Sequence, residues 1–127
     1  MDINELSVLL ENCYSKDTCY SKVRDKWSRD NKTLGHCAIV ALIVNDYFGG
    51  DIYKCYVNNL SHYYNVIDGK LYDLTEKQFG ENVNYIDAKK IERDYLLNDN
   101  ETNYRYKLLK MRLDLLLKGE LDESIND

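Results

Sequence analysis

The sequence has 127 residues and a mass of 15.0 kDa, so at about 100–200 residues per domain it forms one domain, and two independent folds are excluded. With 44% hydrophobic and 31% charged residues it is not a disordered chain, and its longest apolar run, residues 37–44, is far shorter than the roughly 20 residues of a membrane span. The net charge is −5 without any Lys/Arg run, which excludes an electrostatic footprint for nucleic acid.

The charge lies mostly at one end. Residues 119–127 carry four acids and no base, so we expect a single domain over residues 1–118 followed by a solvated acidic tail. The start of the chain has no basic n-region or long apolar h-region, which predicts a cytoplasmic protein. In a reducing compartment the four cysteines are more often buried, catalytic or metal-binding than paired. Their spacing matches no recognised zinc pattern, so neither a metal nor another cofactor is expected.

Helices are predicted first along the chain. Asp2 and Glu5 have the spacing of a capping box, and one helix face follows with Leu6, Leu9, Leu10 and Cys13. A second short helix is predicted from about Asp17, with a buried stripe of Tyr20, Val23 and Trp27. After a polar loop over residues 28–34, Gly35 allows a tight turn before the next element.

Residues 36–48 are apolar on nearly all sides, which predicts a helix buried in the core. A strand is conceivable because several residues are β-branched, but thirteen residues ending at Gly49 and Gly50 suit a helix with a glycine stop better. After Gly50 the spacing of apolar residues changes from the helical period of about 3.6 residues to the strand period of about 2. Three antiparallel strands are predicted, over residues 52–57, 61–67 and 70–74, joined by turns at Asn58-Asn59 and Asp68-Gly69.

The remaining third of the chain is less uniform. A short helical turn is predicted over residues 75–79, and residues 87–97 fit either a helix or a strand. A final helix is clear: Asn98 and Glu101 cap it, Gly119 ends it, and its apolar stripe is Tyr106, Leu109, Leu113 and Leu116.

The second predicted turn fixes which residues face each other. If Asp68-Gly69 is a two-residue loop, Ile67 faces Lys70 and every facing pair of residue numbers sums to 137. His62 and Asp73 then lie diagonally on one face of adjacent strands, about 7–8 Å apart at the backbone, a gap their side chains can close. A three-residue loop would put them on opposite faces, so the prediction depends on that turn.

Cys37 lies in the first turn of the apolar helix. There the helix dipole and unpaired backbone N–H groups favour a thiolate and can bind an oxyanion. Cys37, His62 and Asp73 are therefore candidates for nucleophile, base and orienting acid. Each also has an ordinary structural interpretation: Cys37 as packing, His62 as a satisfied strand histidine and Asp73 as a cap for the following turn.

The predicted architecture is α+β: a buried cysteine-bearing helix packed on a short antiparallel sheet, with flanking helices. A cysteine at a helix start, a histidine on one strand and an acid on the next is the layout of a small papain-like or transglutaminase-like core.

Several strings of the sequence resemble the YunG-like family of uncharacterised bacterial proteins. They begin at Trp27 and continue with NKTLGHCA at 31–38, DYFGG at 46–50, SHYYN at 61–65, DLT at 73–75, QF at 78–79, ET at 101–102 and RY at 105–106. The family pattern usually has Gln, Pro and Trp where this chain has His36, Lys32 and Tyr64. The resemblance implies the fold and a cysteine triad, but no known substrate. If the family's Gln binds an oxyanion, His36 could replace it as an auxiliary group.

The leading hypothesis is a cysteine-dependent acyl-transfer enzyme, a hydrolase, deamidase or transferase acting on a small-molecule or protein acyl substrate. The alternative is a binding or interaction module on the same fold, in which the three residues serve packing. Neither nucleic acid nor a membrane is an expected partner, and the oligomeric state is left open.

Overall fold

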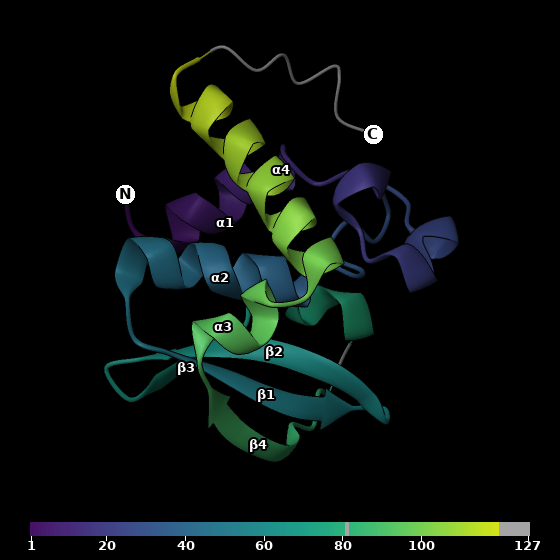
Figure 1. Cartoon of the computed structure of the whole chain (residues 1–127), viewed down its shortest axis with the longest axis vertical. Coiled ribbons are helices and arrows are strands. Elements are labelled where there is room, and N and C mark those ends of the chain that lie inside the picture. Colours follow the sequence, from purple (N-terminus) through teal and green to yellow (C-terminus); the bar gives the residue numbers. More distant parts are fainter. Residues whose placement is uncertain (81, 120–127) are drawn as a thin grey trace.

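In the computed structural model, which describes residues 1–80 and 82–119, helices lie over one face of a four-stranded antiparallel sheet (Figure 1). The helices are α1 (Ile3–Glu11), α2 (Cys37–Phe48), α3 (Arg93–Leu97) and α4 (Asn100–Leu117), and the short 3₁₀ helices are η1 (Lys16–Thr18), η2 (Ser21–Lys26) and η3 (Glu76–Phe79). The strands are β1 (Asp51–Val57), β2 (Leu60–Ile67), β3 (Lys70–Tyr72) and β4 (Ile86–Ile91). The predicted α+β class is confirmed.

The sheet has the strand order β3-β2-β1-β4. The predicted meander is confirmed as β1, β2 and β3, and its register follows the predicted sum of 137, with pairs such as Asn65↔Tyr72 and Ile67↔Lys70. Asp68 and Gly69 both have positive φ, as a two-residue hairpin turn of type I′ requires. The fourth strand, β4, pairs with the outer edge of β1. Residues 87–97, which fit either a helix or a strand, therefore contain both: the strand β4 comes first and the short helix α3 follows it.

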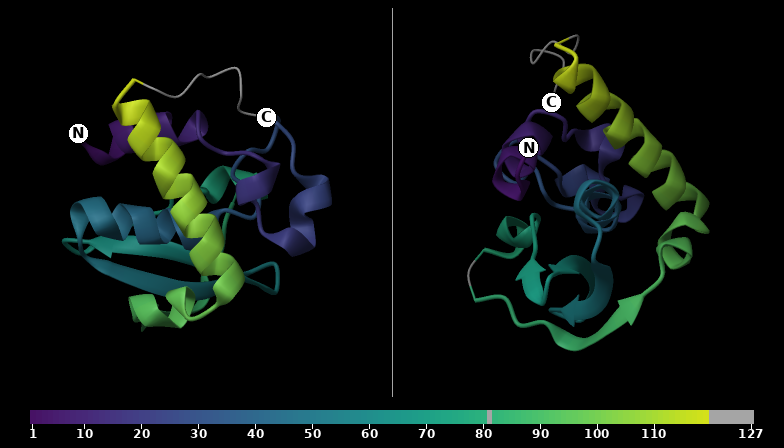
Figure 2. Two further views of the ribbon diagram at one scale, coloured as in Figure 1. Left: turned by 45° about the horizontal axis from the view of Figure 1, so that its top comes forward. Right: turned by 90° about the vertical axis from the view of Figure 1, so that its left-hand side faces the viewer.

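The apolar helix α2 occupies the centre of the molecule. Viewed along its axis, it lies between the sheet on one side and α1 and α4 on the other (Figure 2). Ala38 to Val44 are all buried, which explains why the sequence is apolar on every side. The helix ends at Gly49, with φ of 70° and a bond from its N–H to the carbonyl of Asn45. Among the described residues, no helix is both long and apolar enough to cross a bilayer.

Two local predictions are wrong. The segment after Asp17 forms the 3₁₀ helices η1 and η2 instead of an α-helix, because Tyr20 donates its backbone N–H to the Gly35 carbonyl at 3.0 Å and so joins the neighbouring loop. The last helix begins one residue later than expected. Asp99, not Asn98, is its N-cap and accepts a bond of 3.0 Å from the backbone N–H of Thr102. The predicted acidic tail lies outside the described residues except for Gly119.

Candidate active site

His62 on β2 and Asp73, just after β3, form the closest polar pair of the candidate site. His62 Nε2 lies 2.6 Å from Asp73 Oδ2, and the side chains are 0% and 1% exposed. The hairpin register explains the contact, since it places residues 62, 64 and 73 on one face of adjacent strands. Because an ionised carboxylate only accepts hydrogen bonds, Nε2 carries the proton and donates it.

The carboxylate of Asp73 is held from several sides. Its Oδ1 accepts from the backbone N–H of Thr75 at 3.1 Å and from the Thr75 hydroxyl at 3.2 Å. Its Oδ2 accepts from the Tyr85 hydroxyl at 3.0 Å as well as from His62. Each oxygen therefore has two donors, which fixes the orientation of the carboxylate. Asp73 does begin the turn at Thr75, as its structural interpretation predicts, and it orients His62 at the same time.

The imidazole of His62 has one nitrogen that the fold leaves unused. Nδ1 is buried and has no hydrogen-bond partner among residues 1–80 and 82–119. The Phe79 ring meets the imidazole edge-on at 4.8 Å and helps to hold it in place. Burial would lower the pKa of His62, but the hydrogen bond to Asp73 and the interaction with Cys37 raise it to about 9. The Cys37 thiol is thus one of the groups that interact with the His62 ring.

Cys37 differs from the other three cysteines in exposure. It is partly exposed at the first position of α2, whereas Cys13, Cys19 and Cys55 are 0% exposed. Burial raises the pKa of each of those three thiols to about 11, which keeps them protonated and unreactive at neutral pH. No side chain caps the start of α2, so its first-turn N–H groups remain free to bind an anion.

His36 does not have the role that the sequence suggested. It is 0% exposed, its Nδ1 donates to the Leu34 carbonyl at 2.8 Å, and its Nε2 lies 2.7 Å from the Thr18 hydroxyl. Burial lowers its pKa to about 3, so the ring is neutral. Because both ring nitrogens are engaged, no N–H of His36 is available to a substrate oxyanion. The expected auxiliary role is corrected: His36 fixes the backbone that leads into Cys37.

Arg105 of α4 supports the same backbone and was not identified as a site residue by the sequence reasoning. It is 3% exposed, and its Nη1 donates to the carbonyls of Thr18 at 3.0 Å and Gly35 at 3.2 Å. Gly35 has φ of 74°, and an added Cβ would lie 2.5 Å from Cys19 Sγ, so only glycine fits here. A weak sequence signal existed, since Glu101 and Arg105 have i,i+4 spacing on the helix and lie 3.5 Å apart.

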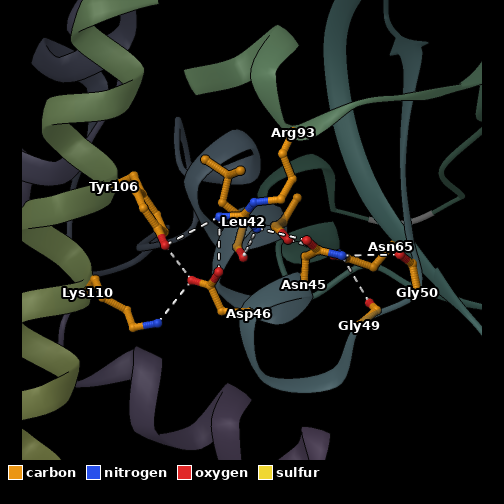
Figure 3. A network of polar contacts seen from close by, with 10 residues as sticks. Leu42, Asn45, Asp46, Gly49, Gly50, Asn65, Arg93, Tyr106 and Lys110 are labelled. Carbon is orange, nitrogen blue, oxygen red and sulfur yellow. Dashed lines mark hydrogen bonds and ion pairs between the residues drawn. The ribbon is translucent and has the colours of Figure 1, made fainter. Parts of the chain in front are cut away.

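The other end of α2 holds a separate polar cluster (Figure 3). Asp46 receives Arg93 Nη2 at 3.0 Å on one oxygen, and Lys110 at 3.0 Å and the Tyr106 hydroxyl at 2.5 Å on the other. Arg93 Nη1 also donates to the Leu42 carbonyl at 3.1 Å and to Asn45 Oδ1 at 2.8 Å. The cluster ties α2 to α3 and α4, and its groups satisfy one another.

Comparison with known proteins places the chain in a family. The family model described as YunG protein matches residues 2–118. The chain belongs to the YunG family. One YunG relative, the Bacillus subtilis (strain 168) protein named "Uncharacterized protein YunG", is 35% identical over 81 residues, which cover 64% of this chain and 70% of the relative. No solved structure matches the chain.

Proposed function

We propose that this protein is a cysteine-dependent acyl-transfer enzyme, a hydrolase, deamidase or transferase, built on a small papain-like or transglutaminase-like core. Cys37 is the nucleophile, His62 the general base and acid, and Asp73 the residue that orients His62. The observation that carries the proposal is the state of His62. One ring nitrogen is held by a fixed carboxylate, and the other is buried and has no partner in the described part of the chain, while the ring interacts with a partly exposed thiol at a helix start.

The first half of the reaction forms a thioester. With the pKa of His62 raised to about 9, its ring is a cation at neutral pH, and the reacting form of Cys37 is its thiolate. Sγ attacks the acyl carbon and a C–S bond forms, while the carbonyl electrons move to oxygen. The uncapped N–H groups at the start of α2 bind that oxyanion. As the tetrahedral intermediate collapses, the leaving group departs with the proton of His62 Nδ1.

The second half breaks the thioester. His62, now neutral, removes a proton from water or from another acceptor, whose oxygen or nitrogen attacks the acyl carbon. The C–S bond breaks, the thiolate re-forms, and the imidazolium is restored, so the enzyme ends as it began. Water as acceptor gives a hydrolase or deamidase, and an amine or alcohol gives a transferase. Through both halves, Asp73 holds the ring orientation and stabilises its charge.

Thiol reactivity tests the nucleophile. Native protein at pH 7 is treated with iodoacetamide, and the alkylated residues are mapped by mass spectrometry. We expect Cys37 to react far faster than Cys13, Cys19 and Cys55, which serve as internal controls in the same chain. Equal, slow labelling of all four thiols would overturn the proposal and favour the binding module.

A chromogenic ester tests acyl transfer itself. Mixing with p-nitrophenyl acetate should release a burst of nitrophenolate close to one equivalent, with an acetyl group found on Cys37. Cys37→Ser should abolish the burst while circular dichroism shows the fold unchanged. A reactive Cys37 that gives no acetyl-enzyme would show that the thiol serves other chemistry.

A further inference from the structure

A group of lysines and tyrosines lies on one face of the sheet near Cys37. The register places Lys54 of β1 directly opposite Tyr63 of β2 on one side and Lys89 of β4 on the other, so the three side chains share a face. Tyr56 lies two residues along β1 on that face, and Tyr95 of α3 covers it. We call these five residues the lysine–tyrosine patch.

The two lysines of the patch face each other on paired strands, which does not stabilise the sheet. Like charges directly opposite on paired strands are destabilising, and neither Lys54 nor Lys89 forms an ion pair within the described part of the chain. The adjacent Lys90 differs, because its ammonium lies 3.2 Å from Asp51. Lys54 instead donates to the Tyr95 hydroxyl at 2.5 Å, with its ammonium 4.9 Å from the centre of that ring. The positive charge of the patch is thus left without an acid to balance it.

Tyr63 connects the patch with the candidate nucleophile. Its half-buried ring packs against the group of buried residues that includes Ala38, the residue after Cys37. Burial raises the pKa of Tyr63, and interactions with Tyr95 and Cys37 raise it further. The Tyr63 side chain therefore connects the patch with the residues packed around the start of α2.

We propose that the lysine–tyrosine patch binds an anionic group of the acyl substrate, so that the preferred acyl donors carry a carboxylate near the carbonyl attacked by Cys37. This inference rests on the proposed function and adds a substrate class to it. Lys54 and Lys89 provide the charge. The tyrosine hydroxyls provide hydrogen-bond donors, and the Tyr63 ring forms the floor between the patch and the thiol.

Two alkylating reagents of nearly equal size test this inference without a known substrate. Iodoacetate and iodoacetamide both transfer a CH₂ group to Sγ with loss of iodide, but only iodoacetate carries a carboxylate. The measured quantity is the ratio of their rate constants at Cys37. We expect Lys54→Gln combined with Lys89→Gln to lower this ratio about fivefold, and 0.5 M KCl to lower the wild-type ratio towards that of the variant.

Lys90→Gln is the matched control. It removes one positive charge from the same strand, but that charge is already paired with Asp51 and lies on the other face of the strand, so the ratio should stay close to wild type. An equal ratio in the wild type, the double variant and the control would overturn the inference. Lys89→Gln alone, at an exposed position, gives a smaller decrease and remains informative if the double variant is unstable.

The two proposals fail in different ways. If Cys37 reacts no faster with iodoacetamide than the buried thiols do, the proposed function is wrong. If Cys37 reacts selectively with iodoacetamide but the ratio of the two rate constants does not change when Lys54 and Lys89 are replaced, only the anion-binding patch is wrong. If the ratio falls equally in Lys90→Gln, the effect comes from net charge alone and the patch is again rejected.

Discussion

The two ends of α2 differ in whether their polar groups are paired with one another. At the C-terminal end, Asp46 is surrounded by Arg93, Tyr106 and Lys110, and each of these groups bonds to another (Figure 3). At the N-terminal end no side chain caps the helix, the Cys37 thiol is partly exposed, and a buried ring nitrogen of His62 has no partner among the described residues. The helix between them is buried from Ala38 to Val44.

This difference separates a structural cluster from a candidate chemical one. A buried polar atom without a partner costs about 1–3 kcal/mol, so proteins rarely retain one without another reason. The Asp46 cluster has no such cost and needs no explanation beyond holding three helices together. His62 Nδ1 does carry this cost, and a proton exchanged with Cys37 would explain it.

The largest expected effect is on thiol reactivity. His62→Ala removes the cation beside Cys37, so the rate of iodoacetamide alkylation of Cys37 at pH 7 should fall about 100-fold. Arg93→Met at the other end of α2 should leave that rate within twofold of wild type, measured below its unfolding temperature. If both variants slowed alkylation equally, the two ends of the helix would not differ in function.

The next effect is on stability and has the reverse pattern. Arg93→Met leaves Asp46 without one of its two cations and frees the carbonyl of Leu42, so the free energy of unfolding in urea should fall by about 1–3 kcal/mol. His62→Gln removes the unpaired ring nitrogen but keeps a polar side chain that can donate to Asp73, so its loss should be smaller. A larger loss in His62→Gln would show that the histidine serves mainly to stabilise the core.

The contrast also shows what sequence could predict. The His62–Asp73 pair followed from one turn, because Asp68 and Gly69 both accept positive φ and thereby fix the register of two strands. β4 was ambiguous because it is an edge strand with nearly all residues exposed, which leaves no alternation of apolar residues to detect.

Contacts between segments far apart in the chain could not be predicted from local sequence patterns. The ring of His36 contacts Thr18. Arg105 donates to the carbonyls of Thr18 and Gly35, which lie 87 and 70 positions before it in the chain. Local patterns place His36 at a helix start and Arg105 on a helix. They do not say which loop will return to meet them, so the role of His36 was misassigned and that of Arg105 was missed.

The two histidines should produce opposite limbs in a plot of stability against pH. The folded-state pKa of His62 is raised to about 9, so its contribution is complete below pH 6.5 and is lost as the pH rises to 9. The folded-state pKa of His36 is lowered to about 3, so its contribution is complete above pH 6.5 and declines as the pH falls. Each limb should be worth roughly 2 kcal/mol over the range from pH 5 to 9.

Urea unfolding at several pH values checks these limbs. Asp73→Asn should flatten the limb between pH 6.5 and 9, and His36→Gln should flatten the limb between pH 5 and 6.5 while leaving the other intact. The buried thiols have folded-state pKa values of about 11 against an ordinary value of 9.0, so they add a decline of their own near pH 9, and that decline remains in Asp73→Asn. A flat wild-type profile across this range would contradict the assigned states of both rings.

The smallest effect gives the most direct comparison of the two ends, because each end has a tyrosine whose hydroxyl donates to a carboxylate. Tyr106→Phe removes the donor to Asp46, and Tyr85→Phe removes the donor to Asp73. Each should cost about 1 kcal/mol of unfolding free energy.

Only Tyr85→Phe should also change the chemistry of the candidate site. With one donor fewer, the Asp73 carboxylate becomes a stronger acceptor and raises the pKa of His62. The pH at which the Cys37 alkylation rate responds to loss of the His62 proton should therefore move slightly higher in Tyr85→Phe and stay in place in Tyr106→Phe. Identical profiles for the two variants would show that Asp73 does not control His62.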